Sequence, residues 1–164
     1  MRIDSVIVFV AKYFFILSPM AVAVVWWRLD SHAKAVYTWQ LILGGLIALA
    51  LARISGHFYY DTRPFVREHV APLFAHAPDN GFPSDHALLT SFLAFVTFRY
   101  AKPVALALTA NALLVSWARV AAKVHSPIDI VGSFVFSLAA VLFVDWLDRR
   151  RRRRPPAVAD SARP

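Results

Sequence analysis

The sequence predicts an all-α protein, a polytopic membrane helix bundle of five or so transmembrane helices. Hydrophobic residues make up 59% of the 164 residues and charged residues only 17%, whereas about half and about a quarter are usual in soluble domains. Several apolar segments are about 20 residues long, which is the length that a helix needs to cross a bilayer. The arginine run from Arg149 to Arg154 directly follows the last apolar segment. This placement indicates a membrane boundary and not a surface that binds nucleic acid.

The first two spanning helices are expected in the N-terminal third of the chain. The apolar run from Val6 to Trp27 would be about 33 Å long as a helix, and it is too long and too aromatic for a cleaved signal peptide. A short polar link, residues 28–36, separates it from the second apolar run, Tyr37 to Gly56. The chain has no cysteine, so it has neither a disulfide framework nor thiolate chemistry.

Three further helices are expected after a polar loop, residues 57–82, which is the one loop large enough to hold a site. They run from Asp85 to about Tyr100, from the turn at residues 99–103 to about Val124, and, after a break at Ser126-Pro127, from Ile128 to Leu147. The sequence therefore predicts one membrane domain, residues 1–147. A basic cytoplasmic tail, residues 148–164, follows it and is expected to be disordered.

The basic residues near the helix ends predict the topology. The arginine run should remain in the cytoplasm. Counting back through five spans places the N-terminus, the 57–82 loop and the 124–127 turn on the outer side. Arg63 and Arg67 in the outer loop depart from the positive-inside rule, and anion binding would explain them.

The segment from Gly81 to His86 combines a turn, a helix start and an imidazole. Ser84 is a good N-cap residue, and Asp85 in the first turn suits the positive end of the helix dipole. A helix that begins here would present free backbone N–H groups to an anion, with His86 beside it. The alternative is a capped helix with an ordinary surface histidine.

The segment from Arg119 to Asp129 places another imidazole near a carboxylate. His125 stands at a turn and Asp129 follows four residues later, so the carboxylate can hold the tautomer of the imidazole and leave its other nitrogen free as a base or nucleophile. The alternative is a helix junction with interfacial charges. All three polar segments are expected on the same side of the membrane, which favours a site that processes phosphate.

These segments resemble the three motifs of the type 2 phosphatidic acid phosphatase superfamily. The motifs stand here as Arg63-Pro64, Pro83-Ser84-Asp85-His86 and Arg119-x5-His125-x3-Asp129. The chain looks most like the bacitracin-resistance branch of undecaprenyl pyrophosphate phosphatases, and the resemblance covers about residues 4 to 147.

The resemblance implies a role for each matching residue. His125 is the nucleophile that takes the phosphoryl group, Asp129 orients it, and His86 protonates the leaving oxygen. The phosphate oxygens are held by Arg63, Arg119, Ser84 and backbone N–H groups near Asp85.

Three positions depart from the superfamily pattern. Gly56 stands where a lysine is usual, Ala118 where a serine is common, and Asp85 where glycine is usual, although aspartate is expected in the bacitracin-resistance branch. Arg53 lies three residues before Gly56, on the same helix face. It is therefore our candidate for the missing cation, with an interfacial anchor as the alternative and with His57 and Lys123 as weaker candidates.

The expected protein is an enzyme that removes phosphate from a polyprenyl pyrophosphate at the outer face of a bacterial inner membrane, through a phosphohistidine. No metal or cofactor is expected, and the partners are the lipid substrate and membrane lipids, with no nucleic acid and the oligomeric state left open. His125 and Asp129 could instead be half of a metal site, and His69 and His76 could line the mouth of the site. One alternative substrate class is another lipid phosphate, such as phosphatidylglycerol phosphate, phosphatidic acid or lipid A. An alternative of another kind is a non-enzymatic transporter or scaffold that binds phosphate.

Overall fold

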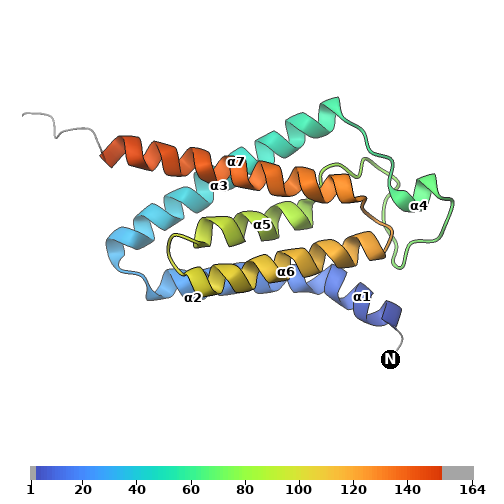
Figure 1. The fold of residues 1–164 in the computed structure, drawn as a ribbon, viewed down its shortest axis with the longest axis horizontal. Helices are drawn as coiled ribbons and strands as arrows, with labels where there is room; N and C mark the ends of the chain where they lie inside the picture. Colours follow the sequence, from blue (N-terminus) through green and yellow to red (C-terminus); the bar gives the residue numbers. More distant parts are fainter. Residues whose placement is uncertain (1–2, 153–164) are drawn as a thin grey trace, which may run out of the picture.

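The computed structural model describes residues 3–152, which form a bundle of helices (Figure 1). The elements are α1 (Ile3–Tyr13), the short 3-10 helix η1 (Phe14–Ile16), α2 (Leu17–Arg28), α3 (Ser31–Phe58), α4 (Pro64–Arg67), α5 (Asp85–Thr97), α6 (Lys102–Ala121) and α7 (Pro127–Arg152). The predicted all-α class is confirmed.

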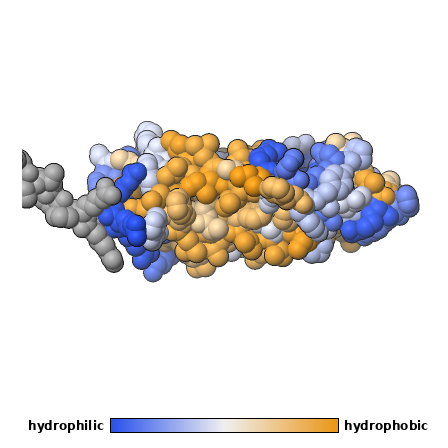
Figure 2. Space-filling view, turned by 90° about the horizontal axis from the view of Figure 1, so that it is seen from above, coloured by the Kyte–Doolittle hydropathy of each residue, from blue (hydrophilic) through white to orange (hydrophobic). Residues whose placement is uncertain are grey.

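Four helical segments are long and apolar enough to cross a membrane. They are Ile3–Arg28, which joins α1, η1 and α2, and the single helices α3, α6 and α7. The fifth helix, α5, has 13 residues and is about 20 Å long, which is shorter than a hydrocarbon core of about 30 Å. It lies among the longer helices in Figure 1, and Figure 2 shows a hydrophobic belt between two hydrophilic ends. The prediction of a multi-pass membrane bundle is confirmed.

Two helix limits differ from the prediction because of local capping. Helix α3 begins at Ser31 and not at Tyr37, since the Asp30 carboxylate accepts a hydrogen bond of 3.0 Å from the Ala33 N–H. Helix α6 ends at Ala121, before the predicted limit, because Lys123 adopts a left-handed conformation with φ of 63°.

Helix α7 is longer than predicted and continues to Arg152. Arg152 Nε lies 3.2 Å from an Asp148 carboxylate oxygen one turn earlier, and the Arg151 guanidinium lies 4.6 Å from the Trp39 ring centre. These contacts extend the helix past Leu147, into the first residues of the predicted tail. The rest of that tail, residues 153–164, lies outside the described residues.

Small polar residues fix α5 against α7. Ser133 Oγ donates a hydrogen bond of 2.9 Å to the Ser84 carbonyl, and Ser137 Oγ donates one of 3.0 Å to the Leu88 carbonyl. Small residues let two helices approach closely inside a membrane. The start of α5 is therefore held in place by a neighbouring helix.

The two ends of the bundle differ. Helix α4, the turn between α6 and α7 and the start of α1 lie at one end, and the last turns of α7 lie at the other (Figure 1). The Arg99 guanidinium binds the Asp148 carboxylate at 2.6 Å at this second end. The three polar segments of the sequence meet at the first end.

Candidate active site

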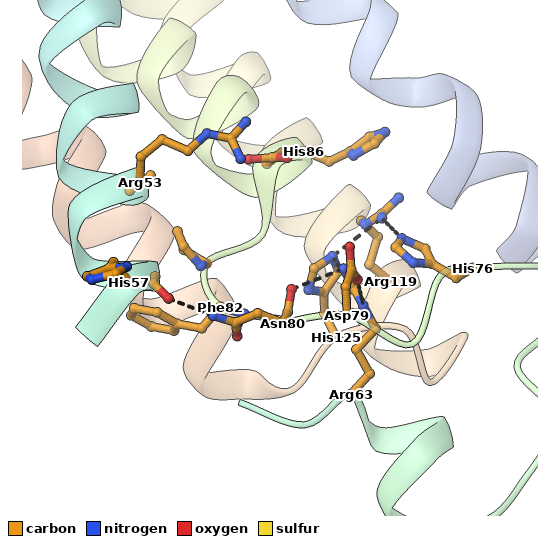
Figure 3. A pocket seen from close by; sticks show the side chains of 14 residues that line it. Arg53, His57, Arg63, His76, Asp79, Asn80, Phe82, His86, Arg119 and His125 are labelled. Carbon is orange, nitrogen blue, oxygen red and sulfur yellow. Dashed lines mark hydrogen bonds and ion pairs between the residues drawn. The ribbon is translucent and has the colours of Figure 1, made fainter. Parts of the chain in front are cut away.

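A cavity of about 520 Å³ opens at the first end of the bundle (Figure 3). It is lined by Ala52, Arg53, Gly56, His57, Arg63, His76, Asp79, Asn80, Phe82, Pro83, Asp85, His86, Arg119 and His125. Residues from all three motifs thus face one space.

His125 lies in the turn between α6 and α7, and its two ring nitrogens have different partners. Nδ1 lies 3.0 Å from the Gly81 carbonyl oxygen and 3.1 Å from Asp129 Oδ2. Both partners are acceptors, so Nδ1 carries the proton and Nε2 keeps its lone pair. The imidazole is in the tautomer that a nucleophile at Nε2 requires.

The surroundings of His125 also keep it neutral. Burial lowers the pKa of the imidazole, the hydrogen bond to Asp129 raises the pKa partly back, and the charges of Arg119 and Arg63 lower it again, so that it lies below its ordinary value. A neutral imidazole is the form that can attack phosphorus.

Asp129 lies behind His125, in the first turn of α7. Its side chain is fully buried, and Oδ2 also accepts a hydrogen bond of 2.8 Å from the Ser126 N–H. Gly81 leaves room for this carboxylate, because a Cβ at residue 81 would lie 2.9 Å from Asp129 Oδ2. Asp129 therefore contacts His125 from outside the cavity that His125 lines.

Arg63, the N-cap residue of α4, and Arg119 of α6 converge on His125. Arg63 Nη1 and Arg119 Nη2 each lie 3.4 Å from His125 Nε2. The Val124 carbonyl accepts a hydrogen bond of 2.6 Å from Arg63 Nη1, and the Ala11 carbonyl accepts one of 3.2 Å from Arg119 Nη1. A phosphoryl group beside Nε2 would be within reach of both guanidinium groups.

The start of α5 lies on another side of the cavity. Ser84 is the N-cap residue as predicted, but its hydroxyl makes no capping hydrogen bond and is buried without a partner among the described residues. Ser84 does not line the cavity, whereas Asp85 and His86 do. Leu88 N–H bonds back to the Ser84 carbonyl at 2.9 Å, so the N–H groups of the preceding helical residues have no partner within the helix.

His86 and Arg53 belong to the part of the cavity away from His125. The ring of His86 packs edge-on against Phe15 of η1, with 4.7 Å between ring centres. In Figure 3 the Arg53 side chain extends from α3 toward His86. The structure therefore places Arg53 in the same cavity as the motif residues.

Loop residues that the motifs do not include complete the site. Asp79 Oδ1 accepts a hydrogen bond of 2.8 Å from Arg63 Nε, and the Asn80 carbonyl accepts one of 3.3 Å from Arg63 Nη2. His76 Nε2 lies 3.2 Å from Arg119 Nη2. Burial and the Arg63 charge lower the pKa of His76, so its neutral ring can accept this hydrogen bond. His76 is predicted from the sequence as a residue that could line the mouth of the site, whereas only the high polarity of the 57–82 loop indicated Asp79 and Asn80.

Neither His69 nor Lys123 lines the cavity. Lys123 instead forms an ion pair of 2.9 Å with Glu68. Among residues 3–152, no group of three or more histidine, aspartate or glutamate side chains is placed to hold a metal ion. The side chains that line the cavity in this part of the chain include three guanidinium groups and four imidazoles.

Comparisons with known proteins place these residues in a family context. A sequence model of the PAP2 superfamily matches residues 37–153. The putative undecaprenyl-diphosphatase YbjG of Escherichia coli is 30% identical over 141 residues, which cover 84% of this chain and 70% of that protein. The undecaprenyl-diphosphatase BcrC of Bacillus subtilis is 26% identical over 138 residues, covering 83% and 70%.

Two further matches differ in what their names report. The bacitracin transport permease protein BcrC of Bacillus licheniformis is 26% identical over 145 residues, covering 88% of this chain and 71% of that protein. The crystal structure of a transmembrane PAP2-type phosphatidylglycerolphosphate phosphatase from Bacillus subtilis matches with a TM-score of 0.64 and 18% identity, over 93% of this chain and 79% of that one. At this identity the second match shows a shared fold.

Proposed function

The chain belongs to the PAP2 superfamily, and on this premise we propose that it is a membrane phosphatase that converts undecaprenyl pyrophosphate to undecaprenyl phosphate and inorganic phosphate. The observation that carries the proposal is the arrangement of His125, whose Nε2 faces the cavity and two guanidinium groups. The names of the relatives from Escherichia coli and Bacillus subtilis support the choice of substrate.

The first chemical step transfers the terminal phosphoryl group to the protein. His125 Nε2 attacks the terminal phosphorus, and the bond from that phosphorus to the bridging oxygen breaks. His86 donates a proton to the bridging oxygen, so that the lipid leaves as a monophosphate. The product on the protein is a phosphohistidine whose Nδ1–H remains bonded to Asp129, which stabilises the positive ring.

The second step releases phosphate. A water molecule attacks the phosphohistidine, His86 takes its proton, and the bond between Nε2 and phosphorus breaks. Arg63 and Arg119 neutralise charge on the phosphoryl oxygens in both steps. These residues supply by themselves the charge stabilisation that metal ions supply in many phosphoryl transfers, so activity should persist in EDTA.

We place the reaction at the outer face of a bacterial inner membrane. The arginine-rich end of α7 lies at the end of the bundle opposite the cavity, and cytoplasmic segments are enriched in lysine and arginine. This orientation supports recycling of a lipid carrier whose pyrophosphate form is released on the outer side.

Phosphate release from a panel of lipids tests the proposed function. The purified protein in detergent is given undecaprenyl pyrophosphate, phosphatidylglycerol phosphate, phosphatidic acid and lipid A, with and without EDTA. We expect the highest kcat/KM on undecaprenyl pyrophosphate, and a loss of several orders of magnitude for a His125→Ala variant that still folds, as its elution in gel filtration would show.

The other outcomes separate the alternatives. A higher kcat/KM on another lipid would keep the phosphatase and replace the substrate. No turnover of any lipid, with phosphate binding retained, would favour a transporter, which the permease name of the Bacillus licheniformis relative makes worth testing. Activity of His125→Ala above a few per cent would remove His125 from the nucleophile role.

A further inference from the structure

We infer that Arg53 on α3 forms a second anion subsite, which binds the phosphate next to the lipid and gives the enzyme a preference for diphosphate over monophosphate substrates. The inference rests on the proposed function and concerns the same cavity. It assigns Arg53 to substrate selection, separately from the groups that activate the terminal phosphate.

The position of Arg53 fits the lipid side of the substrate. In-line transfer requires the leaving oxygen to lie opposite the attacking nitrogen. Figure 3 shows Arg63 and Arg119 grouped around His125, whereas the Arg53 side chain extends toward His86. His86 is the proposed proton donor to the leaving oxygen, so Arg53 lies on the side where the lipid phosphate departs.

Arg53 is also available for a ligand. Arg63 and Arg119 already donate hydrogen bonds to backbone carbonyls, which hold them around His125. Within residues 3–152, no hydrogen bond or ion pair joins Arg53 to another residue, and its side chain is exposed. An arginine that only anchored α3 would be expected to extend toward the membrane interface and not into the cavity.

The charge of the cavity lining supports the same role. The lining contains three arginines and two aspartates, Asp79 and Asp85. Without Arg53, the fixed positive and negative charges of the lining would balance. A diphosphate carries more negative charge than a monophosphate, and it would then enter a partly enclosed space without net opposite charge. Arg53 supplies the net positive charge of the lining.

The packing at Gly56 explains why this cation comes from residue 53. A Cβ at residue 56 would lie 3.0 Å from the Phe82 carbonyl oxygen, and Asn80 Nδ2 donates a hydrogen bond of 2.9 Å to the Gly56 carbonyl. Helix α3 is therefore packed closely against the turn that precedes α5, and a long side chain at residue 56 would displace backbone atoms. The next position toward the N-terminus on the same helix face is Arg53.

Two probes test the inference: a diphosphate that occupies both subsites and a phosphate without a lipid. The kcat/KM for farnesyl diphosphate and the inhibition constant of inorganic phosphate are measured for the full chain in detergent. Arg53→Gln should lower kcat/KM for the diphosphate by about tenfold or more, and it should change the inhibition constant of inorganic phosphate, which binds beside His125, by less than about twofold. Arg53→Lys, which keeps the charge, should retain most of the diphosphate activity. Arg28→Gln, which removes an exposed arginine from the opposite end, is the matched control and should change neither value.

Failure of the Arg53 inference and failure of the proposed function would give different results. A parallel loss for both probes would place Arg53 in the shared phosphate site and overturn the second subsite. A diphosphate kcat/KM unchanged within about twofold would make Arg53 an interfacial anchor. If Arg53→Gln proves less stable in detergent, the activity of Arg53→Lys is used instead. If Arg53→Lys then loses as much diphosphate activity as Arg53→Gln, the inference is overturned. A wild-type protein that releases no phosphate from any lipid would instead refute the proposed function.

Discussion

Four neighbours of His125 determine the tautomer and the protonation state of its ring. The Gly81 carbonyl and the Asp129 carboxylate hold the proton on Nδ1, while Arg63 and Arg119 face Nε2. The acceptors set the tautomer, and burial together with the guanidinium charges opposes a second proton. The two arginines that we propose as phosphate ligands therefore also oppose protonation of the proposed nucleophile before the substrate arrives.

We expect the His125 pKa in the folded protein to lie below the ordinary histidine value of about 6.5. The direction follows from burial and from the charges of Arg119 and Arg63, and it means that the neutral, attacking form persists at more acidic pH. NMR titration of the histidine rings in detergent micelles measures the value, with His125 assigned by its missing signal in His125→Gln. Arg119→Gln should raise the pKa, because one opposing charge is removed. A wild-type pKa at or above about 6.5 would contradict this account.

Residue types at the site were partly predictable. His125, Asp129, His86, Arg63 and Arg119 could be found because their side chains recur in a recognisable motif order. Acceptors supplied by the backbone leave no such signal, since any residue has a carbonyl group. The Gly81 carbonyl and the Asp79 carboxylate come from a loop whose path depends on tertiary contacts, so the sequence did not indicate their partners.

At the scale of elements, the turn from Gly81 to Ser84 is packed closely on several sides. It lies between the end of α3 and the start of α7, with a hydrogen bond of 2.9 Å from the Gly81 N–H to the Asp61 carbonyl. A Cβ on Gly81 would meet two atoms that cannot move easily, Asp129 Oδ2 at 2.9 Å and the Asp61 carbonyl oxygen at 3.2 Å. The turn thus transmits small backbone shifts directly to the proposed nucleophile.

Gly81→Ala should lower kcat by about tenfold or more, because displacing the turn weakens the hydrogen bond from His125 Nδ1 to the residue 81 carbonyl. Thermal stability in detergent should fall as well. Gly45→Ala is the matched control: its Cβ would lie 3.6 Å from the Phe92 ring, an ordinary contact, within helix α3. This control should keep full activity and lose no stability. Equal activity of Gly81→Ala and the wild type would show that the turn does not position His125.

The ends of helices were predicted least well where a single residue determines where the helix begins or ends. Apolar run length located the helices, but the start of α3 depends on the Asp30 cap and the end of α6 on the left-handed Lys123. Charge alone suggested that α7 ends before the arginine run. In the structure, Arg152 binds Asp148 one turn earlier, and this contact lets the helix continue.

The whole molecule is asymmetric along its long axis, with the cavity at one end and the arginine-rich end of α7 at the other. The count of spanning helices predicted that the distant polar segments meet at one end, because the helices of a bundle return each polar link to one of two surfaces. The apolar pattern could not predict how deep α5 lies, since that depends on how α5 packs against α3, α6 and α7.

Cysteine labelling tests the orientation. The chain has no cysteine of its own, so a single introduced thiol reports its own side. Ala77→Cys at the cavity end should react with a membrane-impermeant thiol reagent in intact spheroplasts, and Ser31→Cys at the other end should react only after the membrane is permeabilised. Both positions are exposed in the structure. The reverse pattern would place the cavity in the cytoplasm and contradict an outer-face reaction.

The shortness of α5 also affects the kinetics to expect. Because α5 is about 10 Å shorter than the hydrocarbon core, its N-terminus, where His86 stands, does not reach as far as the ends of its longer neighbours. A lipid head group could meet the proposed catalytic residues while its tail stays among the other acyl chains. Substrate would then reach the enzyme by diffusion in two dimensions. Turnover would follow the mole fraction of substrate in the bilayer, and dilution with inert lipid would slow the reaction even at constant bulk concentration.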